Sequence, residues 1–159
     1  MDHVIIAPHT DDEIIGCYEI LTNPDIKPII IYTTDIEEER KKECMKLKDE
    51  IEIKAQYFLF NIPSNLLNPL SNNIFYFPHP IYETHPEHRY HGMIGESMAR
   101  NGFDVVFYIT EMNAPFKSEC PRPNAKLELL NKIYPSQKEL WKYEHKYFLF
   151  SGYDQWKFF

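Results

Sequence analysis

Short hydrophobic runs alternate along the chain with charged or amphipathic segments of helical length. Continuous β-branched and aromatic runs predict five buried strands, at residues 3–9, 26–34, 55–63, 74–80 and 103–110. Between and after them, apolar spacing and charge predict helices at 12–21, 35–54, 85–100 and 125–134. This alternation favours an α/β class. We expect a Rossmann-like three-layer fold in a compact short version, with a mostly parallel sheet of about five strands.

The remaining segments carry weaker signals. Asp35 is the expected N-cap of the helix over 35–54, and the turn-rich segment 64–73 reads as a loop. A further helix is predicted over 136–148, followed by an aromatic tail at 151–159 that we expect to pack. A stripe of aromatic residues is expected in the core: Phe58, Phe60, Phe75, Tyr76 and Phe77. The 159 residues suit a single domain, 1–159.

Composition narrows the classes of partner. The formal charge is −7 and the basic residues form no long stripe, which argues against non-specific nucleic-acid binding but leaves room for a nucleotide-sized ligand. No apolar run reaches the roughly 18 residues of a membrane span, and the first residues do not resemble a secretory signal. Cys17, Cys44 and Cys120 fit neither a zinc-binding pair nor a disulfide framework. We expect a cytoplasmic protein, or one of a host cytoplasm if its isoleucine-rich composition reflects a phage origin.

Two polar clusters follow predicted strands and suggest a metal site. In "IIAPHTDDEIIG" (5–16), His9 and Asp12 stand three residues apart and can converge on one ion across a single turn. The stretch "HPEH" (85–88) follows the fourth strand and opens at the same carboxyl edge, where ligands bind in α/β sheets. Catalytic zinc takes three protein ligands and one water. Taken alone, the first cluster also fits a helix N-cap and the second a polar loop, but together they favour a metal centre.

These clusters carry a resemblance to a known family. "APHTDDE" followed by Gly16 resembles the AHPDDE…G signature of the PIG-L/LmbE-like deacetylases, and "HPEH" resembles their HPDH motif. Members of this family are zinc-dependent enzymes that remove acyl groups from amino sugars and related N-acyl compounds. Two weaker patterns, RxxE and K…YxSQ, have counterparts in the same order along the chain, at Arg40 and Glu43 and at Lys126, Tyr134, Ser136 and Gln137.

The resemblance implies a set of metal ligands and catalytic groups. His9, Asp12 and His88 match the ligands of the metal, which would be Zn²⁺, with Fe²⁺ or another divalent ion as alternatives. Asp11 matches the general base that takes a proton from the metal-bound water. His85 matches a histidine that, as an imidazolium, stabilises the oxyanion of the tetrahedral intermediate.

The resemblance also bears on the substrate pocket and includes departures. Glu87 stands where the family has an aspartate that orients His85, and Arg40 matches an arginine that lines the pocket in some members. Tyr82 is a weaker candidate, for assisting the leaving group. Thr10 replaces the usual proline, which we expect only to loosen the turn. Because the helix usual between the third and fourth strands is reduced to 64–73, the substrate cannot be inherited from the family.

The leading hypothesis is a metal-dependent hydrolase that removes an N-acetyl or other N-acyl group through a metal-activated water. The substrate would be a small amino sugar, sugar nucleotide or glycoside. One alternative is a deacylase of a modified nucleotide or an amino-acid conjugate, and another is a non-catalytic binding protein that retains the fold. A nucleotide-binding Rossmann module is disfavoured, because no GxGxxG follows the first strand. The expected partner is a small N-acylated molecule, and a homo-oligomer remains open.

Overall fold

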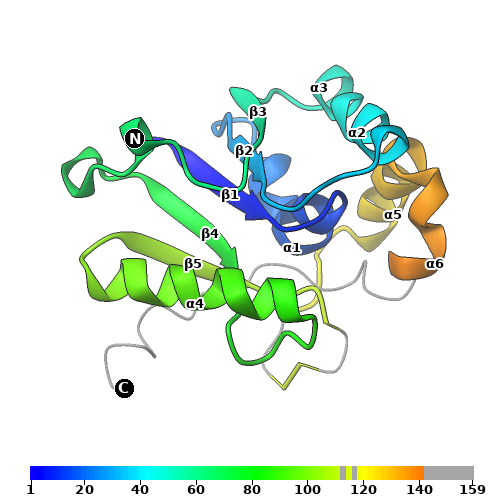
Figure 1. Cartoon of the computed structure of the whole chain (residues 1–159). Helices are drawn as coiled ribbons and strands as arrows, with labels where there is room; N and C mark the ends of the chain where they lie inside the picture. Colours follow the sequence, from blue (N-terminus) through cyan, green and yellow to red (C-terminus); the bar gives the residue numbers. More distant parts are fainter. Residues whose placement is uncertain (112–113, 116–117, 142–159) are drawn as a thin grey trace.

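The computed structural model describes residues 1–111, 114–115 and 118–141 and contains one five-stranded sheet (Figure 1). Its strands are β1 (His3–Ala7), β2 (Ile29–Tyr32), β3 (Ala55–Phe58), β4 (Ile74–Pro78) and β5 (Asp104–Tyr108). They lie in the order β3-β2-β1-β4-β5, and every neighbouring pair is parallel. The predicted α/β class is therefore confirmed, with a sheet that is entirely rather than mostly parallel.

Helices cover both faces of the sheet. On one face the helices α1 (Asp12–Leu21), α2 (Glu38–Met45), α3 (Leu47–Glu50) and α5 (Pro123–Ile133) contribute buried side chains to a common core. On the other face α4 (Pro86–Arg100) packs against β4 and β5. A short helix, α6 (Lys138–Trp141), follows α5 through the 3₁₀ turn η3 (Pro135–Gln137). The three-layer arrangement expected from the sequence is thus present.

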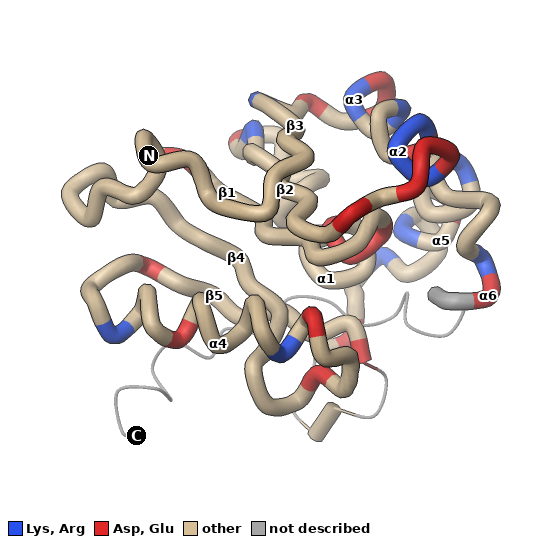
Figure 2. Tube along the Cα trace, viewed as in Figure 1, with Lys and Arg blue, Asp and Glu red and all other residues tan. Residues whose placement is uncertain are grey.

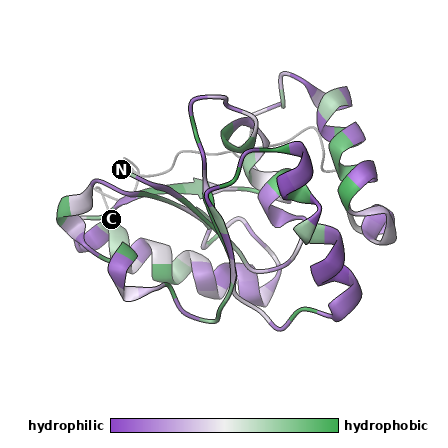
Figure 3. Ribbon diagram, turned by 90° about the horizontal axis from the view of Figure 1, so that it is seen from above, coloured by the Kyte–Doolittle hydropathy of each residue, from purple (hydrophilic) through white to green (hydrophobic). Residues whose placement is uncertain are grey.

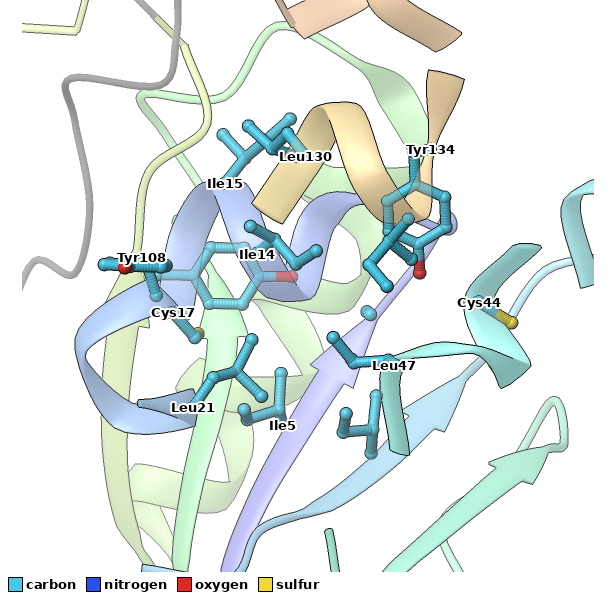
Figure 4. Close-up of a cluster of buried hydrophobic side chains, with 14 of the residues drawn as sticks. Ile5, Ile14, Ile15, Cys17, Leu21, Cys44, Leu47, Tyr108, Leu130 and Tyr134 are labelled. Carbon is cyan, nitrogen blue, oxygen red and sulfur yellow. The ribbon is translucent and has the colours of Figure 1, made fainter. Parts of the chain in front are cut away.

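The continuous hydrophobic runs are explained by burial of the sheet on both faces. Successive side chains of a strand point to opposite faces, so Ile5 and Ala7 join the core beneath α1, while Val4 and Ile6 join the core beneath α4. Figure 4 shows the first of these cores, in which Ile14 and Leu21 of α1 lie near the strand residue Ile5. Because both faces need apolar residues, no polar alternation marks these strands.

The charged segment after β2 forms a shorter helix than predicted. The helix begins at Glu38 rather than Asp35, its N-cap is Glu37, and it divides into α2 and α3 at Lys46. The Lys46 N–H bonds to the Glu43 carbonyl, an i to i−3 bond that tightens the last turn of α2. Figure 2 shows basic and acidic residues interspersed along α2 and α3.

Several other sequence expectations need correction. Phe60 is 72% exposed and lies outside the core, because β3 ends at Phe58, whereas Phe75, Tyr76 and Phe77 are buried as predicted. The turn-rich segment 64–73 forms the predicted loop and contains two 3₁₀ turns, η1 (Ser64–Leu66) and η2 (Pro69–Ser71). Of the helix predicted over 136–148, only α6 and the turn before it fall within the described residues. The tail at 151–159 lies outside them.

The helices of the described residues are amphipathic rather than uniformly apolar. Figure 3 shows mixed hydrophilic and hydrophobic turns along the helices that flank the sheet. Within the described ranges, none of these helices combines the length and the apolar character that crossing a membrane requires.

His79 is a buried structural histidine at the end of β4. Its Nδ1 accepts hydrogen bonds from the backbone N–H groups of Ile81 and Tyr82, at 3.1 and 3.2 Å, and its ring stacks on that of Tyr82. Burial lowers the pKa of His79 to about 4. Protonation of Nδ1 would remove the acceptor that holds this turn, so the folded state favours the neutral ring.

We expect His79 to make stability pH-dependent. A folded-state pKa of about 4, below an unfolded value near ~6.5, means that its contribution is present above pH ~6.5 and is lost as pH falls towards 4. At pH 5 the loss should be roughly 2 kcal/mol. Asparagine keeps an acceptor for the same N–H groups but does not titrate. Urea unfolding at pH 7 and pH 5 should therefore show a smaller loss for His79→Asn, and equal losses in both proteins would refute this role.

Candidate metal centre

The two polar clusters meet at the carboxyl ends of β1 and β4. The chain runs outward from β1 to β3, then crosses back to add β4 on the other side of β1, so the strand order reverses between β1 and β4. Ligands of open α/β sheets bind in the crevice at such a reversal. His9 lies two residues beyond β1, and His88 lies in the first turn of α4, which follows β4.

Three donor atoms converge at this point. His9 Nδ1 lies 3.4 Å from Asp12 Oδ2 and 3.1 Å from His88 Nε2, and Asp12 Oδ2 lies 3.0 Å from His88 Nε2. In a tetrahedral zinc site with bonds of about 2.1 Å, ligand atoms are about 3.4 Å apart. Two imidazoles and one carboxylate with these separations fit such an ion, and they leave one coordination position for water or substrate.

The electrostatics of Asp12 and His88 show a buried pair of opposite charges. Burial alone would raise the pKa of Asp12, but the adjacent His88 and His9 hold that pKa well below its usual range. Burial also disfavours a proton on His88, yet Asp12 and Glu83 raise the pKa of His88 to about 11. Without a metal, the proton on His88 compensates the carboxylate. A divalent cation would supply the same compensation.

The turn before α1 directs His9 and Asp12 to one point. Asp11 adopts a left-handed conformation with φ of 91°, and its carbonyl accepts the N–H groups of Ile14 and Ile15 at 3.0 and 2.9 Å. The His9 N–H donates to Asp12 Oδ2 at 2.8 Å. The turn at Asp11 and the His9–Asp12 hydrogen bond therefore hold these two residues, three positions apart, close to each other.

Two glycines bring α4 close enough to β4 to place His88 at the sheet edge. A Cβ atom at Gly92 would lie 2.6 Å from the Pro78 carbonyl oxygen, and one at Gly95 would lie 2.7 Å from the Phe77 ring. Only glycine permits this approach without movement of the strand. Gly92 is one turn beyond His88, so the contact fixes the part of α4 that carries this histidine.

A cavity of about 310 Å³ opens beside the three donor atoms. Its size falls at the lower end of small-molecule sites. Asp11 and His85 line it together with two of the candidate ligands; the full lining is His9, Asp11, Ile15, Arg40, His85, His88, Thr110 and Glu111. Burial raises the pKa of Asp11 well above its usual value, and the adjacent Asp12 and Glu13 raise it further.

Glu87 lies elsewhere than the family pattern implies. Its Oε2 is 2.7 Å from His9 Nε2, while its backbone N–H donates to His85 Nδ1 at 3.2 Å. Burial and the neighbouring His9 and His88 lower the pKa of His85, against the expectation of an imidazolium. His9, His85 and Glu87 form a second group within ligand reach of one another, but His85 and Glu87 are exposed.

The two weaker substrate-binding candidates differ in their placement. Arg40 lines the cavity, but its Nε and Nη2 atoms donate to Thr10 and Gln137. Tyr82 is not among the residues that line the cavity, and its ring stacks on His79 at a centroid distance of 4.3 Å. The geometry therefore gives no support for Tyr82 at the leaving group.

Glu83 is a buried carboxylate behind His88 that sequence reasoning missed. It is 1% exposed, its Oε2 lies 3.7 Å from His88 Nδ1, and its Oε1 accepts the backbone N–H of Thr110 at 2.6 Å. Metal-binding histidines commonly have such a carboxylate beside the ring nitrogen that does not bind the metal. The only signal in the sequence was an acidic residue five positions before His88.

Changing Glu83 to glutamine should weaken metal binding about tenfold, because the neutral amide no longer favours the orientation and basicity of His88. Glutamine retains an acceptor for Thr110, so the fold should persist. Competition for Zn²⁺ with a chromophoric chelator measures the change. Glu111→Gln is the matched control, since Glu111 lines the same cavity but accepts hydrogen bonds from Thr84. Equal zinc affinities for the wild type and Glu83→Gln would show that Glu83 does not support metal binding by His88.

Comparison with protein-family models, curated proteins and solved structures finds no match to the chain. The resemblance to the deacetylases therefore rests on short motifs and on no whole-chain similarity.

In the structure, residues of the K…YxSQ pattern contact the segment at the start of α1. Lys126 Nζ donates to the Ile15 carbonyl, the Tyr134 hydroxyl donates to Glu13, and Gln137 Nε2 donates to Thr10 Oγ1; the first and third of these bonds measure 2.6 and 3.2 Å.

Proposed function

We propose that the protein is a metal-dependent hydrolase that removes an N-acetyl or other N-acyl group from a small amino sugar, sugar nucleotide or glycoside. The observation that carries this proposal is the convergence of His9, Asp12 and His88 donor atoms beside an open cavity that Asp11 and His85 also line. A metal centre beside a pocket that a carboxylate and an imidazole also line has the groups that amide hydrolysis requires.

Zn²⁺ is the proposed ion, with Fe²⁺ or another divalent metal as alternatives. The donor set supports a borderline ion, because imidazole nitrogens suit zinc and iron, whereas calcium and magnesium prefer oxygen ligands. Once bound, the ion would lower the pKa of a water ligand towards ~7 and polarise the amide carbonyl.

Asp11 is the proposed general base. Asp11 lines the cavity, and its carboxylate makes no capping hydrogen bond to α1. Burial and the flanking carboxylates raise the pKa of Asp11, which favours retention of an accepted proton. Asp11 would take that proton from the attacking water and deliver it to the leaving amine.

His85 is proposed to stabilise the oxyanion as a neutral imidazole. Because its Nδ1 accepts the Glu87 N–H, the ring proton must lie on Nε2. An Nε2–H group can donate to a developing negative charge without a net charge of its own, so the lowered pKa of His85 is compatible with this role. This differs from the imidazolium that the family resemblance implies.

A screen for acetate release tests the proposal. Zinc-loaded protein is incubated with N-acetylated sugars, sugar nucleotides, nucleosides and amino-acid conjugates, with chelated protein and Asp11→Asn as controls. We expect release from at least one sugar derivative, dependent on both the metal and Asp11. Release from nucleosides or amino-acid conjugates alone would favour the alternative substrate class. Full metal occupancy with no release from any compound would identify a binding protein that retains the fold.

A further inference from the structure

The backbone that separates the candidate ligands adopts an unfavourable conformation. Asp11, with φ of 91°, is one of two non-glycine residues with positive φ among the described residues. Such conformations are sparsely populated and persist only where surrounding contacts impose them. The Asp11 side chain makes no capping hydrogen bond of its own. The contacts that could impose this conformation are made by the neighbouring residue, Thr10.

Thr10 is fully buried and joined to two distant segments. Arg40 of α2 donates through Nε to Thr10 Oγ1 at 3.0 Å and through Nη2 to the Thr10 carbonyl at 3.1 Å. Gln137 of η3 donates to the same hydroxyl at 3.2 Å and accepts from Arg40 Nη2. The three side chains form a closed ring of hydrogen bonds around the peptide that enters Asp11.

We propose that Arg40, Thr10 and Gln137, here called the Thr10 bracket, position the metal centre by holding the left-handed turn at Asp11. This inference rests on the proposed function, because it assigns the bracket to the metal site described above. Arg40 is then a positioning residue, and its direct role as a substrate ligand is replaced by one that acts through the backbone. Displacement of the Thr10–Asp11 peptide would move His9 and Asp12 relative to each other.

The bracket also explains the threonine that stands in place of the family's proline. Proline would restrict the backbone by its ring but would offer no side-chain acceptor. Thr10 instead supplies a hydroxyl that accepts hydrogen bonds from two side chains. Hydrogen bonds therefore restrain the backbone where the ring of a proline would otherwise do so. Thr10 is therefore a point of attachment, which corrects the expectation that it only loosens the turn. Lysine cannot reproduce the bidentate hydrogen bonding of the Arg40 guanidinium to Thr10.

The test measures Co²⁺ affinity and the visible absorption of the Co²⁺ protein, neither of which requires turnover. Thr10→Val removes the acceptor and keeps the branched shape, and Thr10→Ser restores the acceptor. We expect Thr10→Val and Arg40→Lys to weaken Co²⁺ binding about tenfold and to alter the absorption bands, with Thr10→Ser close to the wild type. Arg122→Lys is the matched control, because Arg122 also joins a threonine, Thr22, at the opposite end of α1.

The outcomes separate failure of the bracket from failure of the proposed function. Wild-type affinity and absorption in both Thr10→Val and Arg40→Lys would overturn the bracket and leave the metal centre intact. An unchanged Co²⁺ site with a raised KM in Arg40→Lys would show that Arg40 binds substrate and does not position the metal centre. A wild-type protein that binds no Co²⁺ would overturn the metal centre itself, and the positioning role with it. If Thr10→Val does not fold, the contrast in Co²⁺ affinity between Arg40→Lys and Arg122→Lys still tests whether the Thr10 bracket positions the metal centre.

Discussion

Replacing His88 by alanine is expected to lower zinc affinity by roughly 10²-fold or more and, with the metal, to abolish the proposed hydrolysis. Loss of a residue that only orients a ligand already costs 10–100-fold, and removal of one of three ligands should cost more. In the metal-free protein His88 also compensates the buried Asp12 carboxylate, so the variant should be less stable until a cation binds. Metal content after dialysis against a weak chelator measures the loss.

His91→Ala provides the matched control for His88→Ala. His91 lies one turn further along α4, is also buried, and bonds through Nδ1 to the Glu87 carbonyl at 2.7 Å. It belongs to neither group of candidate ligands among the described residues. We expect His91→Ala to retain its zinc. Equal, tight zinc occupancy in His88→Ala would contradict the assignment of this ligand.

Asp11→Asn is expected to reduce turnover by roughly 10²–10⁴-fold while metal binding stays close to that of the wild type. Asparagine tolerates a left-handed backbone, so the turn with φ of 91° should be preserved and the loss should report the missing base. Steady-state rates, together with metal content, measure both properties on the same preparation.

The adjacent aspartate supplies the contrast for Asp11→Asn. Asp12 Oδ2 lies within 3.4 Å of both candidate histidine ligands, so Asp12→Asn should lose the metal as well as the activity. If Asp12→Asn kept its metal and Asp11→Asn lost it, the roles of base and ligand would have to be exchanged.

The fold was accessible from the sequence because hydrophobic burial on both faces leaves a continuous apolar run in each strand. The run at β1 extends to the polar cluster, and this predicts His9 at the carboxyl edge of the sheet, where the structure has it. The limits of the elements were less accessible. Phe60 continues the aromatic pattern of β3, yet it lies beyond the last strand pairing, at Phe58, and is exposed. Local composition does not reveal where a strand loses its neighbour.

The site was partly accessible for a similar reason. Two clusters after two strands of one sheet had to meet at one edge, so the approach of the HPEH histidines to His9 and Asp12 followed from topology. The choice of His88 rather than His85 as the third ligand came from the family resemblance. Glu83 and Thr10 were missed as functional residues because their roles depend on contacts with Thr110, Arg40 and Gln137. These partners lie 27 to 127 residues away along the chain. No periodic pattern encodes such contacts.

The orientation of the Glu87 side chain is another feature that could not be predicted from the sequence. The family pattern pairs this position with His85, whereas the carboxylate contacts His9. Which of two neighbouring histidines this carboxylate contacts depends on the placement of the segment after β1 against α4, and the sequence alone does not reveal it.

Anomalous X-ray diffraction at the zinc edge, from crystals of the zinc-loaded protein, tests the metal centre most directly. We expect one strong peak bonded to His9 Nδ1, Asp12 Oδ2 and His88 Nε2 at about 2.0–2.2 Å, with its open coordination position facing the cavity lined by Asp11 and His85. The absence of a peak there, or a single peak among His9, His85 and Glu87 instead, would contradict the proposed centre.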